Sequence, residues 1–145
     1  MVISVPGGSV PAAHLILYGR CTIMMETHPR SVRWMGDSRE VLRGFPESVR
    51  WTFGRALYKA QIGKRHRNVS PLKGPLGGVL KLTGSEQGSA FRLYFTLKCP
   101  GYVDVLFAHQ KKSKRGIGIP THQETLILSR LKARLADCGS DSEGT

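Results

Sequence analysis

The chain has 145 residues, which suits one ordinary domain and is too short for two full cores. Its 22 Lys and Arg residues outnumber 10 Asp and Glu residues, so the formal net charge is +12, while 40% of the residues are hydrophobic. That apolar content excludes a wholly disordered chain, and apolar runs of at most four residues exclude a membrane-spanning helix, which needs about 20. The excess of positive charge predicts a polyanionic partner, and we expect nucleic acid before an anionic lipid surface.

The two ends of the sequence differ from its middle. Residues 1–29 contain three of the eight prolines and sustain no period, which predicts a disordered extension or a misassigned start, with translation beginning at Met24 or Met25. Residues 137–145 are rich in Gly, Ser and acidic residues and are predicted to form a disordered tail. The folded domain is therefore expected to span residues 30–136.

The cysteines indicate the compartment. Cys21, Cys99 and Cys138 lie far apart and form no CxxC pair. This spacing argues against a zinc ribbon, a redox motif and a disulfide-stapled scaffold, and it favours a reducing cytosol. No basic and then apolar leader precedes a cleavage site, so the predicted location is cytoplasmic.

The first regular elements begin at Ser31. Residues 31–35 alternate between polar and apolar, which predicts a strand. Asp37 and Glu40 form a variant of the capping box that begins a short helix, and Gly44 ends this helix. Residues 46–62 then predict an amphipathic helix with one apolar face. That face consists of Val49, Phe53, Ala56, Leu57 and Ala60.

A basic loop at residues 63–78 leads into three predicted strands. They cover residues 79–83, 90–97 and 102–109, and the last is the most apolar. A second basic loop at residues 111–115 precedes a final helix over residues 121–135, which has a T-x-x-E capping box. The predicted order is β-α-α-β-β-β-α, a small α+β domain with an antiparallel sheet and its helices packed on one face.

Strand alternation gives the sheet a candidate RNA-binding face. Lys81, Arg92 and Tyr94 are expected to point away from the helices, and the two basic loops can reach the same face. The residues predicted to bind RNA are Lys81, Tyr94, Lys112 and Lys114. Cations that neutralise phosphates beside an aromatic ring that stacks on a base suit single-stranded RNA, although the alternative is an ordinary solvated face.

The candidate chemistry needs neither metal nor cofactor. The five histidines show no HxxxH or HExxH spacing, and the chain has no G-x-S-x-G elbow and no P-loop, so no metal or cofactor is expected. RNA cleavage can use the substrate's 2′-OH as nucleophile, with a base, an acid and cations on the phosphate. We expect an arginine to clamp the phosphate, a lysine among cations to act as base, and His109 to act as acid. The alternative is a structural His109, since alternation groups it with Val105 and Phe107.

Several short segments, in this order and spacing, resemble the RelE/HigB-like toxin superfamily, in its phage-derived branch. They are Arg33-Trp34, the PESVR at 46–50, the PLKG at 71–74, the QKKS at 110–113 and Pro120, and the resemblance covers roughly residues 30–135. It implies a compact α+β fold, ribosome-dependent cleavage of mRNA, and inhibition by a small antitoxin that is often a helix-turn-helix protein.

The resemblance also implies which residues do the work. Carried over to this chain, the catalytic residues are Lys73 in PLKG, Arg92 on the third predicted strand and Lys111 in QKKS, with His109 as a further candidate. Family members have His and then Phe before QKK, whereas here the order is Phe107-Ala108-His109, which leaves the role of the histidine open.

Three functions fit these observations. The first is an endoribonuclease toxin that acts on ribosome-bound mRNA. The second is a ParE-like inhibitor of DNA gyrase, because fold does not determine function. The third is a nucleic-acid-binding remnant of a toxin that has no catalytic activity.

Overall fold

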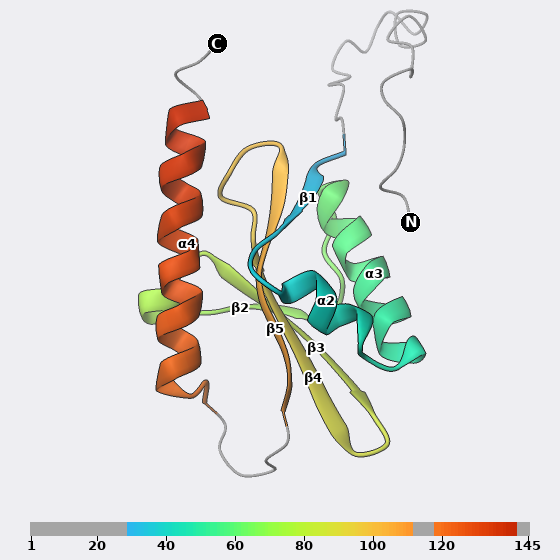
Figure 1. Cartoon of the computed structure of the whole chain (residues 1–145). Coiled ribbons are helices and arrows are strands. Elements are labelled where there is room, and N and C mark those ends of the chain that lie inside the picture. The colour runs from blue at the N-terminus through green and yellow to red at the C-terminus, as the bar shows by residue number, and fades with distance from the viewer. Residues whose placement is uncertain (1–28, 112–117, 142–145) are drawn as a thin grey trace, which may run out of the picture.

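A computed structural model describes residues 29–111 and 118–141 (Figure 1). Within these ranges the helices are α2 (Ser38–Arg43), α3 (Glu47–Gln61) and α4 (Thr121–Asp141), with a short 3-10 helix, η3 (Gly74–Leu76). The strands are β1 (Ser31–Trp34), β2 (Val69–Pro71), β3 (Val79–Glu86), β4 (Ser89–Thr96) and β5 (Tyr102–Lys111). Residues 1–28 of the predicted N-terminal extension and the last four residues of the predicted tail lie outside the described residues.

The strands form one five-stranded sheet in the order β1-β5-β4-β3-β2. Strands β2 to β5 pair antiparallel, but β1 pairs parallel with β5, so the predicted fully antiparallel sheet is wrong at this edge. A parallel pair needs a long crossover, and here two helices and three strands separate β1 from β5. The sequence pattern also missed β2, which has three residues inside the predicted loop.

The predicted core of α3 is confirmed. Its five predicted apolar residues are all buried, and they pack against β3, β4, β5 and Phe45. Phe53 is fully buried and its ring meets Phe45 at a centroid distance of 6.0 Å. Gly84 of β3 lies directly under Phe53, where a Cβ atom would come within 2.8 Å of the ring. Residue size on this face is therefore tightly constrained.

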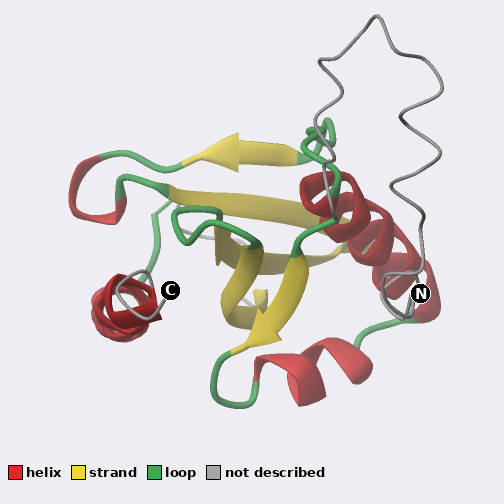
Figure 2. Ribbon diagram, turned by 90° about the horizontal axis from the view of Figure 1, so that it is seen from above, coloured by secondary structure: helices red, strands yellow, loops and turns green. Residues whose placement is uncertain are grey.

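The prediction that all helices pack on one face of the sheet is wrong for α4. Figure 2 shows α4, the helix that ends near the C label, on the opposite side of the sheet from α3. Ile127 and Leu131 of α4 pack with Leu76, Tyr94 and Leu106 in a second core. An amphipathic helix at the end of a chain has an apolar stripe that fits either face, so its own pattern cannot choose between them.

Asp37 does not form the predicted capping box. It occupies the N-cap position of α2, but its side chain makes no capping hydrogen bond. Its carboxylate lies 3.9 Å from Arg130 of α4 instead. The pair is largely exposed on the Asp37 side, and such pairs contribute about 0–1 kcal/mol. Asp37 therefore contacts α4 weakly and does not cap α2 with its side chain.

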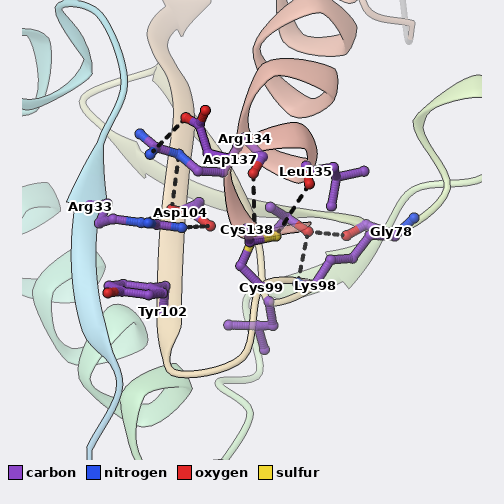
Figure 3. Close-up of a disulfide and its surroundings, with 12 residues drawn as sticks. Arg33, Gly78, Lys98, Cys99, Tyr102, Asp104, Arg134, Leu135, Asp137 and Cys138 are labelled. Carbon is purple, nitrogen blue, oxygen red and sulfur yellow. Dashed lines mark hydrogen bonds and ion pairs between the residues drawn. A yellow bond between two sulfur atoms is a disulfide. The ribbon is translucent and has the colours of Figure 1, made fainter. Parts of the chain in front are cut away.

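A buried carboxylate joins β1 and α4 to β5. Asp104 is fully buried, and its Oδ1 lies 2.7 Å from Nε of Arg33 and 3.3 Å from Nε of Arg134 (Figure 3). The Arg33 guanidinium also stacks over the Tyr102 ring, 3.5 Å from its centroid. Breaking a buried ion pair from one side costs about 3–5 kcal/mol, because it leaves the other charge unpaired. This network explains how a charged residue sits in the middle of the most apolar strand.

Two of the cysteines form a disulfide, although their spacing argued against a disulfide-stapled scaffold. Cys99, after β4, is bonded to Cys138 near the end of α4, with their Cα atoms 5.7 Å apart (Figure 3). The prediction of no disulfide is therefore corrected. A separation of 39 residues carries no spacing signal, and the pairing depends on α4 running past the β4–β5 turn. The helix continues to Asp141, so residues 137–141 are helical where a disordered tail was predicted.

Candidate active site

A β-bulge sets the face on which the candidate residues lie. Tyr94 pairs with Phe107 but the next residue, Phe95, pairs with Val105, so Leu106 is an extra residue in β5. A bulge reverses the alternation beyond it. Val105 therefore packs in the α3 core, whereas Phe107 lies on the α4 side. The prediction that grouped His109 with Val105 is wrong for this reason.

Register then brings Arg92 and His109 together. The two residues are direct partners across β4 and β5, and Lys111 follows His109 two positions later on the same face. Arg92, His109 and Lys111 are all partly exposed. Thr83 of β3 is the partner of Arg92 on the other side, although the sequence pattern did not single it out. Three of the four predicted catalytic residues thus lie side by side.

His109 lies in a stack of aromatic rings. Its ring centroid is 5.4 Å from that of Phe107 and 6.0 Å from that of Tyr94, and both pairs are close to parallel. Burial and then the charge of Arg92 lower the pKa of His109 below its usual 6.5, with a further lowering from Lys111 and an opposing backbone hydrogen bond at Gln110. The imidazole is therefore neutral at pH 7.

The Nε2 atom of His109 is buried and has no hydrogen-bond partner. A buried polar atom without a partner costs about 1–3 kcal/mol. Such atoms are rare in folded proteins and often mark a strained or catalytic site. The imidazole thus combines a neutral state with an unused nitrogen beside an arginine.

Tyr94 does not lie on an open face as predicted. It is fully buried beneath α4, in the same core as Ile127 and Leu131. Burial raises the pKa of Tyr94, and the nearby Arg92 guanidinium partly opposes this effect. Its hydroxyl has no hydrogen-bond partner of good geometry. In this conformation Tyr94 supports the ring of His109 and is not available to stack on a base.

The remaining predicted residues are spread more widely. Lys81 pairs with Tyr94, so it lies on the same face as Arg92, and it is partly exposed. Lys73 is exposed just before η3, where the backbone of Leu72 bonds to Val79. Val79 is four positions along β3 from Thr83, about 13 Å, so the structure does not bring Lys73 to Arg92. Lys112 and Lys114 lie outside the described residues.

Arg130 is a supporting residue that the sequence pattern missed. Its Nη1 donates a hydrogen bond of 2.7 Å to the carbonyl of the bulged residue Leu106. Its guanidinium also lies 5.9 Å from the centroid of the Phe107 ring. Arg130 therefore connects α4 to the bulge that orients His109. Its place on the helix alone gave no indication of this contact.

A surface hollow lies next to the candidate residues. It has a volume of about 550 Å³, and its walls include Thr52 of α3, Asn68, Thr83 and Arg92. The strand β2 pairs only with residues 80–82 of β3, so this hollow follows the part of β3 that β2 leaves uncovered. The hollow therefore extends from the sheet toward α3, and its walls include polar side chains and the guanidinium of Arg92.

Two further features are absent from residues 29–111 and 118–141. No group of three or more His, Cys, Asp or Glu side chains in these ranges is placed to hold a metal ion. None of the helices there combines the length and the apolar character needed to cross a bilayer.

Comparison with known protein families agrees with the resemblance seen in the sequence. Residues 40–132 match the family described as phage derived protein Gp49-like. Among solved structures, the chain is similar to one in the RelBE2 toxin–antitoxin complex from Mycobacterium tuberculosis, with 19% identity and a TM-score of 0.42 over 59% of this chain and 94% of that chain. A search of curated proteins found no match. The matched segment covers β3, β4, β5 and most of α4, together with α3, and the chain therefore belongs to the Gp49-like family of phage-derived proteins, a RelE/HigB-like toxin family.

Proposed function

We propose that this protein is the toxin of a type II toxin–antitoxin pair and cleaves mRNA on the ribosome without a metal ion. The observation that carries the proposal is the register of β4 and β5, which sets Arg92 directly across from a neutral His109, with Lys111 two residues further along β5. Two cations and a titratable group are the minimum set for a reaction whose nucleophile belongs to the substrate.

The reaction that fits this set is transesterification. The 2′-oxygen attacks the adjacent phosphorus, and the bond from phosphorus to the 5′-oxygen breaks, which leaves a 2′,3′-cyclic phosphate and a free 5′-hydroxyl. His109 accepts the proton of the 2′-OH, and the Lys111 ammonium donates a proton to the departing 5′-oxygen. Arg92 stabilises the extra negative charge that the phosphate carries in the transition state.

This assignment changes the role that the sequence suggested for His109. A general acid must carry a proton at the working pH, and burial with neighbouring cations holds His109 in its neutral form. A neutral imidazole is suited to act as the base. Because Nε2 is buried in the free chain, the proposal requires the side chains above the ring to open when RNA binds.

The proposed partners follow from this activity. They are mRNA on the ribosome and a cognate antitoxin, which we expect to be a small helix-turn-helix protein. An adjacent reading frame of about 100 codons with a helix-turn-helix pattern would support the pair. For this activity we propose a cytoplasmic location, where the Cys99–Cys138 disulfide of the structure would be exposed to reduction.

The test is the Arg92→Ala variant, expressed under an inducible promoter. Removing one donor of this kind lowers a rate by about 10²–10³, so induction should no longer arrest growth, and new mRNA ends should disappear. Arg39→Ala is the matched control, because Arg39 is an exposed arginine on α2, and α2 carries none of the candidate catalytic residues.

Two outcomes contradict the proposal. Growth arrest and new RNA ends that persist in Arg92→Ala would exclude this mechanism. Arrest by the wild-type protein with a DNA-damage response and no new RNA ends would favour the gyrase inhibitor.

A further inference from the structure

A second basic surface lies away from Arg92, between α3 and the loop that follows it. A hollow of about 730 Å³ is present there, within the range of about 300–1,000 Å³ typical of ligand sites. We call it the Trp51 hollow. Its lining residues are Trp51, Thr52, Arg55, Lys59, Arg65, His66, Arg67, Asn68 and Val69.

The charged side chains that line the Trp51 hollow are all positive. No Asp or Glu occurs between Glu47 and Glu86 in the sequence, so the lining has cations without acidic neighbours. Within the described part of the chain, none of the salt bridges involves the three arginines and the one lysine of the lining. Burial and then the charges of Lys59, Arg67 and Arg55 lower the pKa of His66, which indicates that these charges converge on one place.

The loop that carries these cations is held in place by its own hydrogen bonds. The side-chain amide of Asn68 donates a hydrogen bond of 3.1 Å to the Thr83 carbonyl. In return, the Thr83 backbone N–H donates a hydrogen bond of 3.2 Å to the Asn68 carbonyl. The Nδ1 of His66 accepts a bond from the Asn68 backbone N–H at 3.1 Å, which leaves a proton on Nε2 in the neutral ring. These hydrogen bonds fix the backbone that carries the lining cations, so the hollow has a defined shape.

Trp51 adds an aromatic ring to the rim. Its side chain is 68% exposed, more than any other large hydrophobic residue described. It lies on the outer side of α3, where it adds nothing to the core around Phe53. An exposed indole beside several cations is the combination that binds a stacked base and its phosphate in single-stranded nucleic acids.

The Trp51 hollow adjoins the smaller hollow beside Arg92. Thr52 and Asn68 form walls of both hollows, and the smaller one reaches Arg92. We propose that single-stranded RNA leaving the Arg92 site runs along the uncovered part of β3 and is held in the Trp51 hollow, with its phosphates on Arg65 and Arg67 and a base on Trp51. The choice of RNA rests on the proposed function, whereas the site itself rests on these contacts.

The experiment measures binding without cleavage. The probe is a fluorescein-labelled 2′-O-methyl oligouridine of twelve nucleotides, which lacks the 2′-OH nucleophile, and affinity is read by anisotropy at several salt concentrations. Arg65→Ala/Arg67→Ala should weaken binding about tenfold at 0.15 M salt and reduce the salt slope by about 1.4. The matched control Arg39→Ala/Arg50→Ala also removes two exposed arginines, both outside the hollow, and should change affinity much less.

Stacking is tested separately. Trp51→Ala should weaken binding about fivefold or more, and Trp51→Phe should restore most of the loss because it keeps an aromatic face. Binding should also quench tryptophan fluorescence in the wild type and less so in Trp51→Phe. Thermal unfolding of each variant checks that the fold is kept.

Three results would overturn the proposal. In the first, Arg65→Ala/Arg67→Ala binds like its control. In the second, Trp51→Ala binds like the wild type. In the third, polyglutamate of equal charge competes as well as the oligonucleotide, which would make the hollow a site for an acidic protein segment. The two proposals can fail separately. If the hollow variants bind RNA like their controls while Arg92→Ala still abolishes cleavage, the hollow proposal fails and the proposed activity stands. If the hollow variants lose binding while Arg92→Ala still cleaves RNA, the proposed activity fails and the hollow proposal stands.

Discussion

On the α3 side of the sheet, the packed groups are apolar, and Phe45 meets Phe53 and Phe91 with ring centroids 6.0 and 4.8 Å apart. On the α4 side, the same strands bury a tyrosine hydroxyl and an imidazole nitrogen without hydrogen-bond partners. Next to them lies the guanidinium of Arg92. One side gains stability from dry packing, and the other gives up some stability to keep polar groups unpaired.

The difference between the two sides of the sheet indicates which side carries the candidate catalytic residues. Neither side is distinguished by its share of aromatic residues, since both contain several. They differ in whether polar atoms are satisfied, and unsatisfied polar atoms are costly. Substitutions on the α3 side should therefore change stability, and those on the α4 side should change activity.

Phe53→Ala should give the largest effect. Phe53 is fully buried, so its loss leaves a cavity and should lower the free energy of unfolding by about 3–5 kcal/mol. Urea denaturation followed by circular dichroism measures the change. Phe107→Ala is the matched variant on the α4 side, and because Phe107 is partly exposed it should cost clearly less. Equal losses would break the comparison.

Tyr94→Phe should have a smaller effect of opposite sign. It removes a buried hydroxyl whose nearest polar neighbour, Arg92, makes no hydrogen bond of good geometry to it, and it keeps the ring that supports His109. The free energy of unfolding should stay the same or rise by about 1 kcal/mol. A loss of 1 kcal/mol or more in the same denaturation assay would show that the hydroxyl is satisfied in solution.

The smallest effect on stability is expected from His109→Gln, but its pH dependence is informative. The folded pKa of His109 is lowered, so the unfolded chain binds more protons below pH 6.5, and stability contributed by the neutral ring is lost as pH falls through that region. The variant should lose this component of the denaturation profile. For cleavage, the base must be neutral, so the acid limb of the kcat/KM profile should lie below pH 6.5 in the wild type and vanish in the variant.

How much of this could be predicted from the sequence depended on the kind of pattern. The apolar face of α3 repeats with the helical period, and its five buried apolar residues were each predicted. The alternation of β4 put Arg92 and Tyr94 on the same face as Lys81, as predicted. These features depend on neighbours along the chain.

The features that could not be predicted depend on contacts between distant segments. The side of the sheet that α4 covers, the parallel pairing of β1 and the Cys99–Cys138 bond are settled by packing across the chain. Tyr94 was predicted to be exposed because the cover of α4 could not be read from β4. The Trp51 hollow forms between α3 and a loop whose cations were visible in the sequence, although their enclosure was not.

The extra residue at Leu106 has a consequence for insertions and deletions in β5. A strand that is out of step by one residue turns every later side chain to the other side. An insertion or deletion of one codon in β5 before His109 would therefore turn its ring to the other face of the sheet, together with every later residue of the strand.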